Sequence, residues 1–185
     1  MSKSRGNVVS PLELTKKYGT DALRMALIIG NTPGTSTALY EEKIKAYKLF
    51  ANKLWNVARF VLTATAGAKL DDDALLNDKD RATLKAFADV ATSVTEDIEG
   101  YRFYLAGEKI YQYVWRIFAD KIREESKPYL EGTDDAARRS AQIMLFKLLE
   151  QSLIILHPFM PFITEEIWQS LPNRTQPLII TSYGY

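Results

Sequence analysis

The sequence contains no cysteine and only one histidine, His157, among its 185 residues. Without cysteine it can form no disulfide and offers no thiolate nucleophile, and a single histidine leaves too few ligands for a structural zinc site. One histidine beside a helix end also provides no Ser-His-Asp triad. The carboxylate pairs Glu41-Glu42, Glu124-Glu125 and Glu165-Glu166 are sequence neighbours, which do not face each other on a helix. We therefore predict no metal site and no complete active site in this chain.

Long apolar runs and net charge are also missing. The most apolar stretch, residues 153–163, is interrupted by a histidine and two prolines, so no segment has the length of a membrane span. The N-terminus carries Lys3 and Arg5 without the apolar segment of a signal peptide. The net charge is +1, which by itself indicates no charged partner. We expect a cytoplasmic protein with no membrane partner.

The sequence does contain strong helical periodicity. Apolar residues recur at steps of three and four through most of the chain, and glycine or proline lies near most of the expected ends. The expected helices cover residues 11–17, 21–29, 40–66, 78–98, 103–125, 132–156 and 164–171, and an extended tail follows from residue 176. Four long helices with short connections predict an all-α fold, an antiparallel helix bundle preceded by a short helical connecting segment. Helix 103–125 is expected to be central and well buried, because its apolar positions cover much of its circumference, with Pro128 just beyond its end.

Several local interactions are expected at helix ends. Thr20 or Asp21 is a candidate cap for the second helix, and Thr164 is a candidate cap for the last one. Asp21 and Arg24 lie three residues apart on one helix and can form an ion pair. His157 lies near two prolines and is expected to anchor a turn. All of these roles are structural.

One helix face indicates binding to RNA. No acidic residue occurs between Glu42 and Asp71, and projecting helix 40–66 at 100° per residue aligns basic and amide side chains on one stripe. The stripe consists of Lys45, Lys48, Asn52, Asn56 and Arg59, with Phe60 on its flank. Cations suit phosphates, amides suit base edges, and an aromatic ring suits unstacked bases. The alternative, equally weighted from the residues alone, is that Phe60 packs against a neighbouring element and the asparagines bridge helices.

Four segments resemble class I aminoacyl-tRNA synthetases, in the order of that family. The opening Met1-Ser-Lys-Ser-Arg-Gly-Asn-Val-Val9 resembles the KMSKS loop without its leading lysine, and Tyr18-Gly-Thr-Asp-Ala-Leu-Arg24 resembles the segment after it. The segment 41–60, with Asn-Lys-Leu-Trp-Asn-Val-Ala-Arg-Phe, and the segment 156–168, with His-Pro-Phe-Met-Pro-Phe, resemble the anticodon-binding domain of the valine, isoleucine and leucine group. The sequences of these two segments are most similar to those of the valine-specific members. Isoleucine- or leucine-specific members are the alternative.

The resemblance implies three regions. Residues 1–39 would be the end of a catalytic domain, residues 40–172 a helical-bundle anticodon-binding domain, and residues 173–185 a C-terminal tail. In the full enzyme, Ser2, Lys3 and Ser4 would meet the phosphates of ATP, which is used with Mg. The HIGH motif and the nucleotide-binding fold are missing from this sequence, so we expect no adenylate formation and no bound cofactor from this chain alone.

The implied partners are a tRNA anticodon stem-loop and the rest of the synthetase chain. The residues expected to contact RNA are Lys43, Lys45, Lys48, Asn52, Asn56, Arg59 and Phe60. An alternative of another class is a structural helical bundle with no appreciable RNA binding in isolation. The two differ in the salt dependence of binding, because the logarithm of the affinity falls by about 0.7 per phosphate contact for each tenfold rise in salt.

Overall fold

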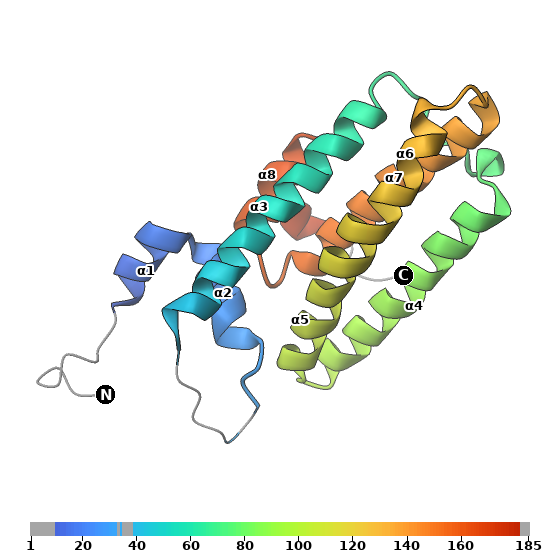
Figure 1. Ribbon diagram of the computed structural model, residues 1–185. Helices are drawn as coiled ribbons and strands as arrows, with labels where there is room; N and C mark the ends of the chain where they lie inside the picture. The colour runs from blue at the N-terminus through green and yellow to red at the C-terminus, as the bar shows by residue number, and fades with distance from the viewer. Residues whose placement is uncertain (1–9, 33, 35–38, 182–185) are drawn as a thin grey trace, which may run out of the picture.

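A computed structural model describes residues 10–32, 34 and 39–181, and within these ranges the chain forms helices and no strand. Four long rods run side by side in alternating directions (Figure 1). They are α3 (Glu41–Ala64), α4 (Asp78–Glu99), the continuous rod from Phe103 to Glu131, and α7 (Asp135–Leu156). The short helices α1 (Pro11–Tyr18), α2 (Thr20–Ile28) and α8 (Pro161–Gln169) pack around one side of this bundle. The predicted all-α antiparallel bundle is therefore confirmed.

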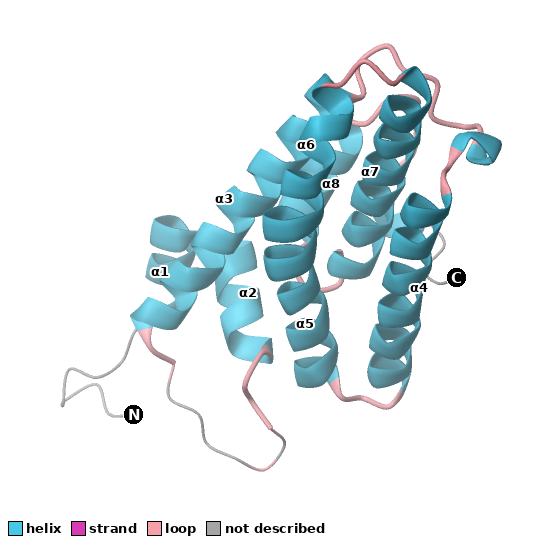
Figure 2. Ribbon diagram, turned by 45° about the vertical axis from the view of Figure 1, so that its right-hand side comes forward, coloured by secondary structure: helices cyan, strands magenta, loops and turns pink. Residues whose placement is uncertain are grey.

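Helix α3 follows the periodicity that predicted it. Its buried residues include Ile44, Leu54 and Val61, which recur at helical spacing in the sequence, and Phe50 and Val57 lie on the same buried face. The helix ends just before Gly67, whose φ of 73° is a conformation that glycine adopts without strain. One long side of α3 faces the core, and the opposite side is left exposed on the outside of the bundle (Figures 1 and 2).

The third rod differs from its prediction. It consists of α5 (Phe103–Gln112), a π-helical segment (Tyr113–Ile122) and α6 (Arg123–Glu131), and α6 contains Pro128. The expected end near residue 125 was wrong. Proline removes one backbone donor and weakens a helix interior, but Pro128 lies near the end of α6, where few hydrogen bonds depend on it. Packing of α6 along α7 stabilises the added turn, because tertiary contacts commonly override local propensity.

Helix α7 contributes the largest number of buried residues among the described helices, and the third rod is less buried than predicted. Twelve of the 22 residues of α7 are buried, and it contacts α3, α4, α5, α6 and α8. In the third rod, Phe103 and Ile117 are exposed. The number of apolar residues in each helix did not indicate which of the two is more buried. Burial depends on contacts between segments that are distant in the sequence.

The last helix begins earlier than predicted. Pro161 occupies its first turn, and Thr164 lies inside it, where the Thr164 Oγ1 donates to the Met160 carbonyl at 2.8 Å. Thr164 therefore does not cap α8. The tail is not simply extended, because Leu178–Ile180 form a 3₁₀ turn that buries Leu178. None of the helices in the described ranges is long and apolar enough to cross a membrane.

The start of α8 is capped by α2 instead. The Asp21 carboxylate accepts from the backbone N–H of Phe162 at 3.2 Å and of Ile163 at 2.7 Å. The Arg24 guanidinium donates to the Pro158 carbonyl at 2.7 Å. Asp21 and Arg24 thus bind segment 158–163 from one helix face, and among the described ion pairs none joins the two to each other. The expected capping of α2 by Thr20 or Asp21 was wrong, because Gly19 is its N-cap and no side chain caps it, whereas Asp21 and Arg24 both have structural contacts.

Candidate nucleic-acid interface

The five side chains of the predicted stripe share one exposed face of α3. Each of them is exposed, and their spacing of three or four residues keeps them in line along the helix. They are Lys45, Lys48, Asn52, Asn56 and Arg59. The first turn of α3 contains Glu41, whose carboxylate is occupied by Lys17 and by the Tyr18 hydroxyl at 2.5 Å. Glu42 is the other acid of this first turn, and from Lys45 to Arg59 the face presents cations and amides without a carboxylate.

Two lysines in the first half of α3, Lys43 and Lys48, have other contacts. The Lys48 Nζ donates to the Lys17 carbonyl at 3.0 Å, where it meets the C-terminal end of α1. The Lys43 Nζ donates to the Ile29 carbonyl at 2.6 Å. Burial lowers the pKa of Lys43 below its ordinary value. The structure therefore places Lys43 against the loop after α2, apart from the exposed stripe.

Phe60 lies on the flank of the stripe and is half-buried. It packs against the hydrophobic core, and the Arg123 guanidinium of α6 lies 6.0 Å from the centre of its ring. A guanidinium at this distance makes a cation–π contact. Phe60 thus connects α3 to α6 while part of its ring stays accessible beside the stripe.

A hollow of about 270 Å³ lies on the other flank of the stripe. Its wall on α3 includes Trp55, Arg59 and Leu62, and its wall on the α8 side includes Ile167 and Ser170. The lining is mostly apolar, and Arg59 places a cation at its edge. An apolar hollow beside a cation is suited to a stacked base next to its phosphate.

Trp55 is the residue that sequence reasoning missed. It is absent from the predicted stripe, yet it is 40% exposed. The signal was present in the helix projection, because Trp55 precedes Arg59 by four residues and therefore lies on the same side of α3. Only the position of α8 decides that this edge of the helix is left open.

The remaining predicted site residues, Ser2, Lys3 and Ser4, lie outside the described residues. Over the described ranges, no group of three or more His, Asp or Glu residues could hold a metal ion.

Two family descriptions match the chain. "Anticodon-binding domain of tRNA ligase" matches residues 80–183, and "tRNA synthetases class I (I, L, M and V)" matches residues 1–39. Similar curated proteins include valine–tRNA ligases of Geobacter sulfurreducens, 43% identical over 190 residues, and of Bacillus cereus, 37% identical over 186 residues. These alignments cover 100% and 99% of this chain but 21% of each relative. The chain therefore spans about a fifth of the length of these relatives.

Solved structures agree with the fold. The LeuRS of Agrobacterium radiobacter K84, in its ternary complex with tRNA and LeuAMS, matches with a TM-score of 0.76 at 19% identity, covering 99% of this chain and 21% of that one. The apo methionyl-tRNA synthetase of Mycobacterium tuberculosis matches with a TM-score of 0.71 at 21% identity, covering 89% and 36%. At such identities the likeness concerns the fold alone. Since the anticodon-binding description matches more than half of its length, this chain belongs to the family of anticodon-binding domains of class I tRNA ligases.

Proposed function

We propose that this chain binds the anticodon stem-loop of a tRNA through the exposed face of α3. The observation that carries the proposal is the stripe from Lys45 to Arg59, which lacks an unpaired carboxylate and lies beside the Trp55 hollow in a member of this family. Base-specific recognition of RNA targets unstacked loop bases, which need a stacking surface and hydrogen-bonding groups close together. The α3 face supplies both.

Each residue type has a distinct task in the proposed complex. Lys45, Lys48 and Arg59 face phosphates, which gives affinity and orients the loop without reading its sequence. Asn52 and Asn56 present donors and acceptors to base edges, and Trp55 offers its exposed ring to one base. Specificity among tRNAs therefore rests on the amides and the hollow, whereas the salt dependence rests on the cations.

The same proposal extends to the larger protein. The valine–tRNA ligases support valine as the amino acid, with ATP and Mg used by the full enzyme and the rest of the synthetase chain as the second partner. A cytoplasmic location belongs to the same proposal. The residues expected to meet ATP, Ser2, Lys3 and Ser4, lie outside the described ranges, so no catalytic step is derived for them.

The test is fluorescence anisotropy of labelled anticodon stem-loops titrated with the chain between low and moderate salt. The RNAs are the valine loop, its single-base anticodon variants, and the isoleucine and leucine loops. Three phosphate contacts predict a slope of about −2 for log affinity against log salt. Preference for the valine loop supports the full proposal. Preference for another loop changes the amino acid, and a slope near zero with equal weak binding supports the structural bundle.

Two substitutions with matched controls locate the interface. Trp55→Ala removes the stacking ring and is expected to weaken binding about 5- to 150-fold, because one base stack contributes roughly 1–3 kcal/mol. Tyr129→Ala is its control, because Tyr129 is 42% exposed on α6, close to the 40% of Trp55. Arg59→Gln is expected to flatten the salt slope by about 0.7, and Lys85→Gln on α4 is expected to leave it unchanged. If a variant and its control had equal effects on binding, α3 would not be part of the RNA interface.

A further inference from the structure

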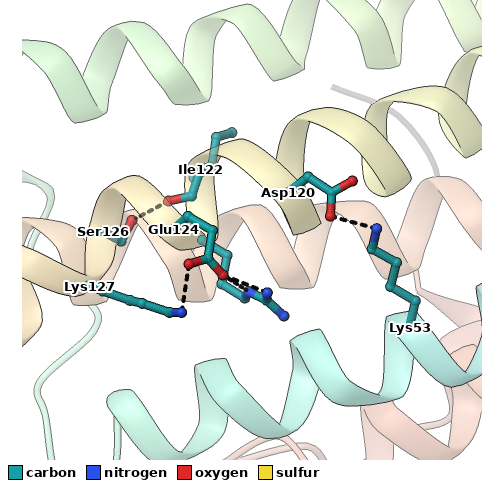
Figure 3. Close-up of polar contacts among 7 residues, drawn as sticks. Lys53, Asp120, Ile122, Glu124, Ser126 and Lys127 are labelled. Carbon is teal, nitrogen blue, oxygen red and sulfur yellow. Dashed lines mark hydrogen bonds and ion pairs between the residues drawn. The ribbon is translucent and has the colours of Figure 1, made fainter.

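A second group of charges faces α3 from the start of α6. The Glu124 carboxylate lies between two cations, as Figure 3 shows. Its Oε1 accepts from Arg123 Nη2 at 2.6 Å, and its Oε2 accepts from Lys127 Nζ at 2.6 Å. We call these three residues the α6 clasp. Both carboxylate oxygens are occupied, so two cations converge on one small anionic group.

The clasp lies next to the proposed RNA-binding face. The Arg123 guanidinium is 6.0 Å from the Phe60 ring, and Asn56 lies one helical turn before Phe60 on the same side of α3. The π-helical segment ends at Ile122, and the Ser126 Oγ donates to the Ile122 carbonyl at 2.7 Å, which fixes the first turn of α6 (Figure 3). The cations of α6 therefore continue the basic surface of α3 across the gap between the two helices.

The clasp, which lies within α6, differs from the ion pair that joins α3 to the π-helical segment. Lys53 pairs with Asp120 at 2.6 Å, lies 4.0 Å above the Trp115 ring and is only 22% exposed, so it is fixed by packing. The Glu124 and Lys127 side chains are 45% and 42% exposed, and the Arg123 side chain is 26% exposed. Exposed ion pairs contribute little to stability and are screened by salt. The Glu124 carboxylate can thus leave its partners at small cost to the fold.

We propose that Arg123 and Lys127 form a phosphate subsite for the RNA backbone, in which Glu124 occupies the place of a phosphate until RNA binds. This inference rests on the proposed function. A phosphodiester presents two unesterified oxygens, and arginine binds such a pair of oxygens as it binds a carboxylate. Hydrogen bonds from Lys127 and Arg123 lower the pKa of Glu124, so this carboxylate is ionised at neutral pH and competes with the phosphate.

The experiment measures binding of the labelled valine anticodon stem-loop by the full chain as salt is varied. The clasp variants are Glu124→Gln, Arg123→Gln and Lys127→Gln. The controls are Asp89→Asn and Lys85→Gln, which change the net charge equally within an exposed pair on α4, a helix that packs on α5 and α7. Thermal unfolding of every variant is recorded first. Arg123 also contacts Phe60, so Lys127→Gln, which leaves that contact in place, decides the question if Arg123→Gln is destabilised.

The expected result has opposite signs within the clasp. Glu124→Gln strengthens binding about two- to five-fold relative to Asp89→Asn. The reason is that RNA no longer has to break the exposed ion pairs of Glu124 before its phosphate can bind Arg123 and Lys127. Lys127→Gln and Arg123→Gln weaken binding and each reduce the salt slope by about 0.7, whereas Lys85→Gln does not. Clasp variants that match their controls, while Arg59→Gln still weakens binding, would overturn the subsite alone. Absence of any salt-dependent binding by the unmodified chain would overturn the proposed function itself.

Discussion

The cap that α2 provides for α8 gives the sharpest test of the fold. Asp21 is 7% exposed and accepts two backbone N–H groups at the start of α8, from Phe162 and Ile163. The preceding residue, Met160, has no side-chain acceptor to offer them. Asp21→Ala therefore leaves two amide donors without their acceptor in a partly buried place.

The magnitude follows from these two hydrogen bonds. A hydrogen bond to a charged group contributes about 1.5–3 kcal/mol, which would give roughly 3–6 kcal/mol for two. Burial raises the pKa of Asp21 above 3.8, although the amides of Ile163 and Phe162 lower it. The cost of burying the charge thus offsets part of the gain. We expect Asp21→Ala to lower the free energy of unfolding by about 2–3 kcal/mol, or the melting temperature by about 4–12 °C. Asp21→Asn keeps one acceptor oxygen and should cost about 1 kcal/mol, because one of the two hydrogen bonds is lost.

The assay is urea unfolding followed by circular dichroism and by tryptophan fluorescence, since Trp168 lies in α8. Hydrogen exchange at the Phe162 and Ile163 amides gives the local readout, and both should lose protection in Asp21→Ala. Asp89→Ala, on exposed α4, is the control and should cost less than about 0.5 kcal/mol. Loss of less than about 0.5 kcal/mol in Asp21→Ala, with both amides still protected, would refute the capping role.

Two further predictions concern other charged residues. Burial lowers the pKa of His157 below 6.5, so the unfolded chain takes up the proton first as the pH falls and stability declines below pH 6.5. The urea midpoint should therefore fall more from pH 7 to pH 5 in the unmodified chain than in His157→Gln, and parallel profiles would contradict this. Asp97 is 3% exposed and pairs with Arg102 at 2.8 Å and Lys109 at 2.5 Å. Because both partners are well exposed, Asp97→Asn should lower the free energy of unfolding by only about 1–2 kcal/mol, measured by urea unfolding. A change near zero would show that these ion pairs do not stabilise the turn between α4 and α5.

Much of the fold could be predicted because it depends on local periodicity. Ile44, Leu54 and Val61 repeat at helical spacing, so the core side of α3 was visible in the sequence. Pro128 and Thr164 misled for one reason. Both are strong local signals for helix ends, yet packing on α7 extends the helix through Pro128, and Asp21 caps α8 from a distant part of the chain. Local rules do not include such partners.

The candidate site could be predicted only as one helix face. The charge pattern identified the exposed stripe from Lys45 to Arg59, since the periodicity of one helix determines which side chains share a side. The hollow beside Trp55 and the contact of Lys43 with the loop after α2 depend on where other helices lie. Lys43 and Phe60 remain predictions as RNA contacts.

The contact between Asp21 and α8 also sets an order of events during synthesis. Asp21 and the amides that it caps are 141 and 142 positions apart in the chain. At about 5–20 residues per second, translation separates the two by about 7–28 s. Helix α2 can dock on α3 during that interval. The Asp21 carboxylate then stays hydrated until α8 is synthesised. If translation paused before residue 161, α2 and α3 could therefore already be packed together before α8 has been synthesised.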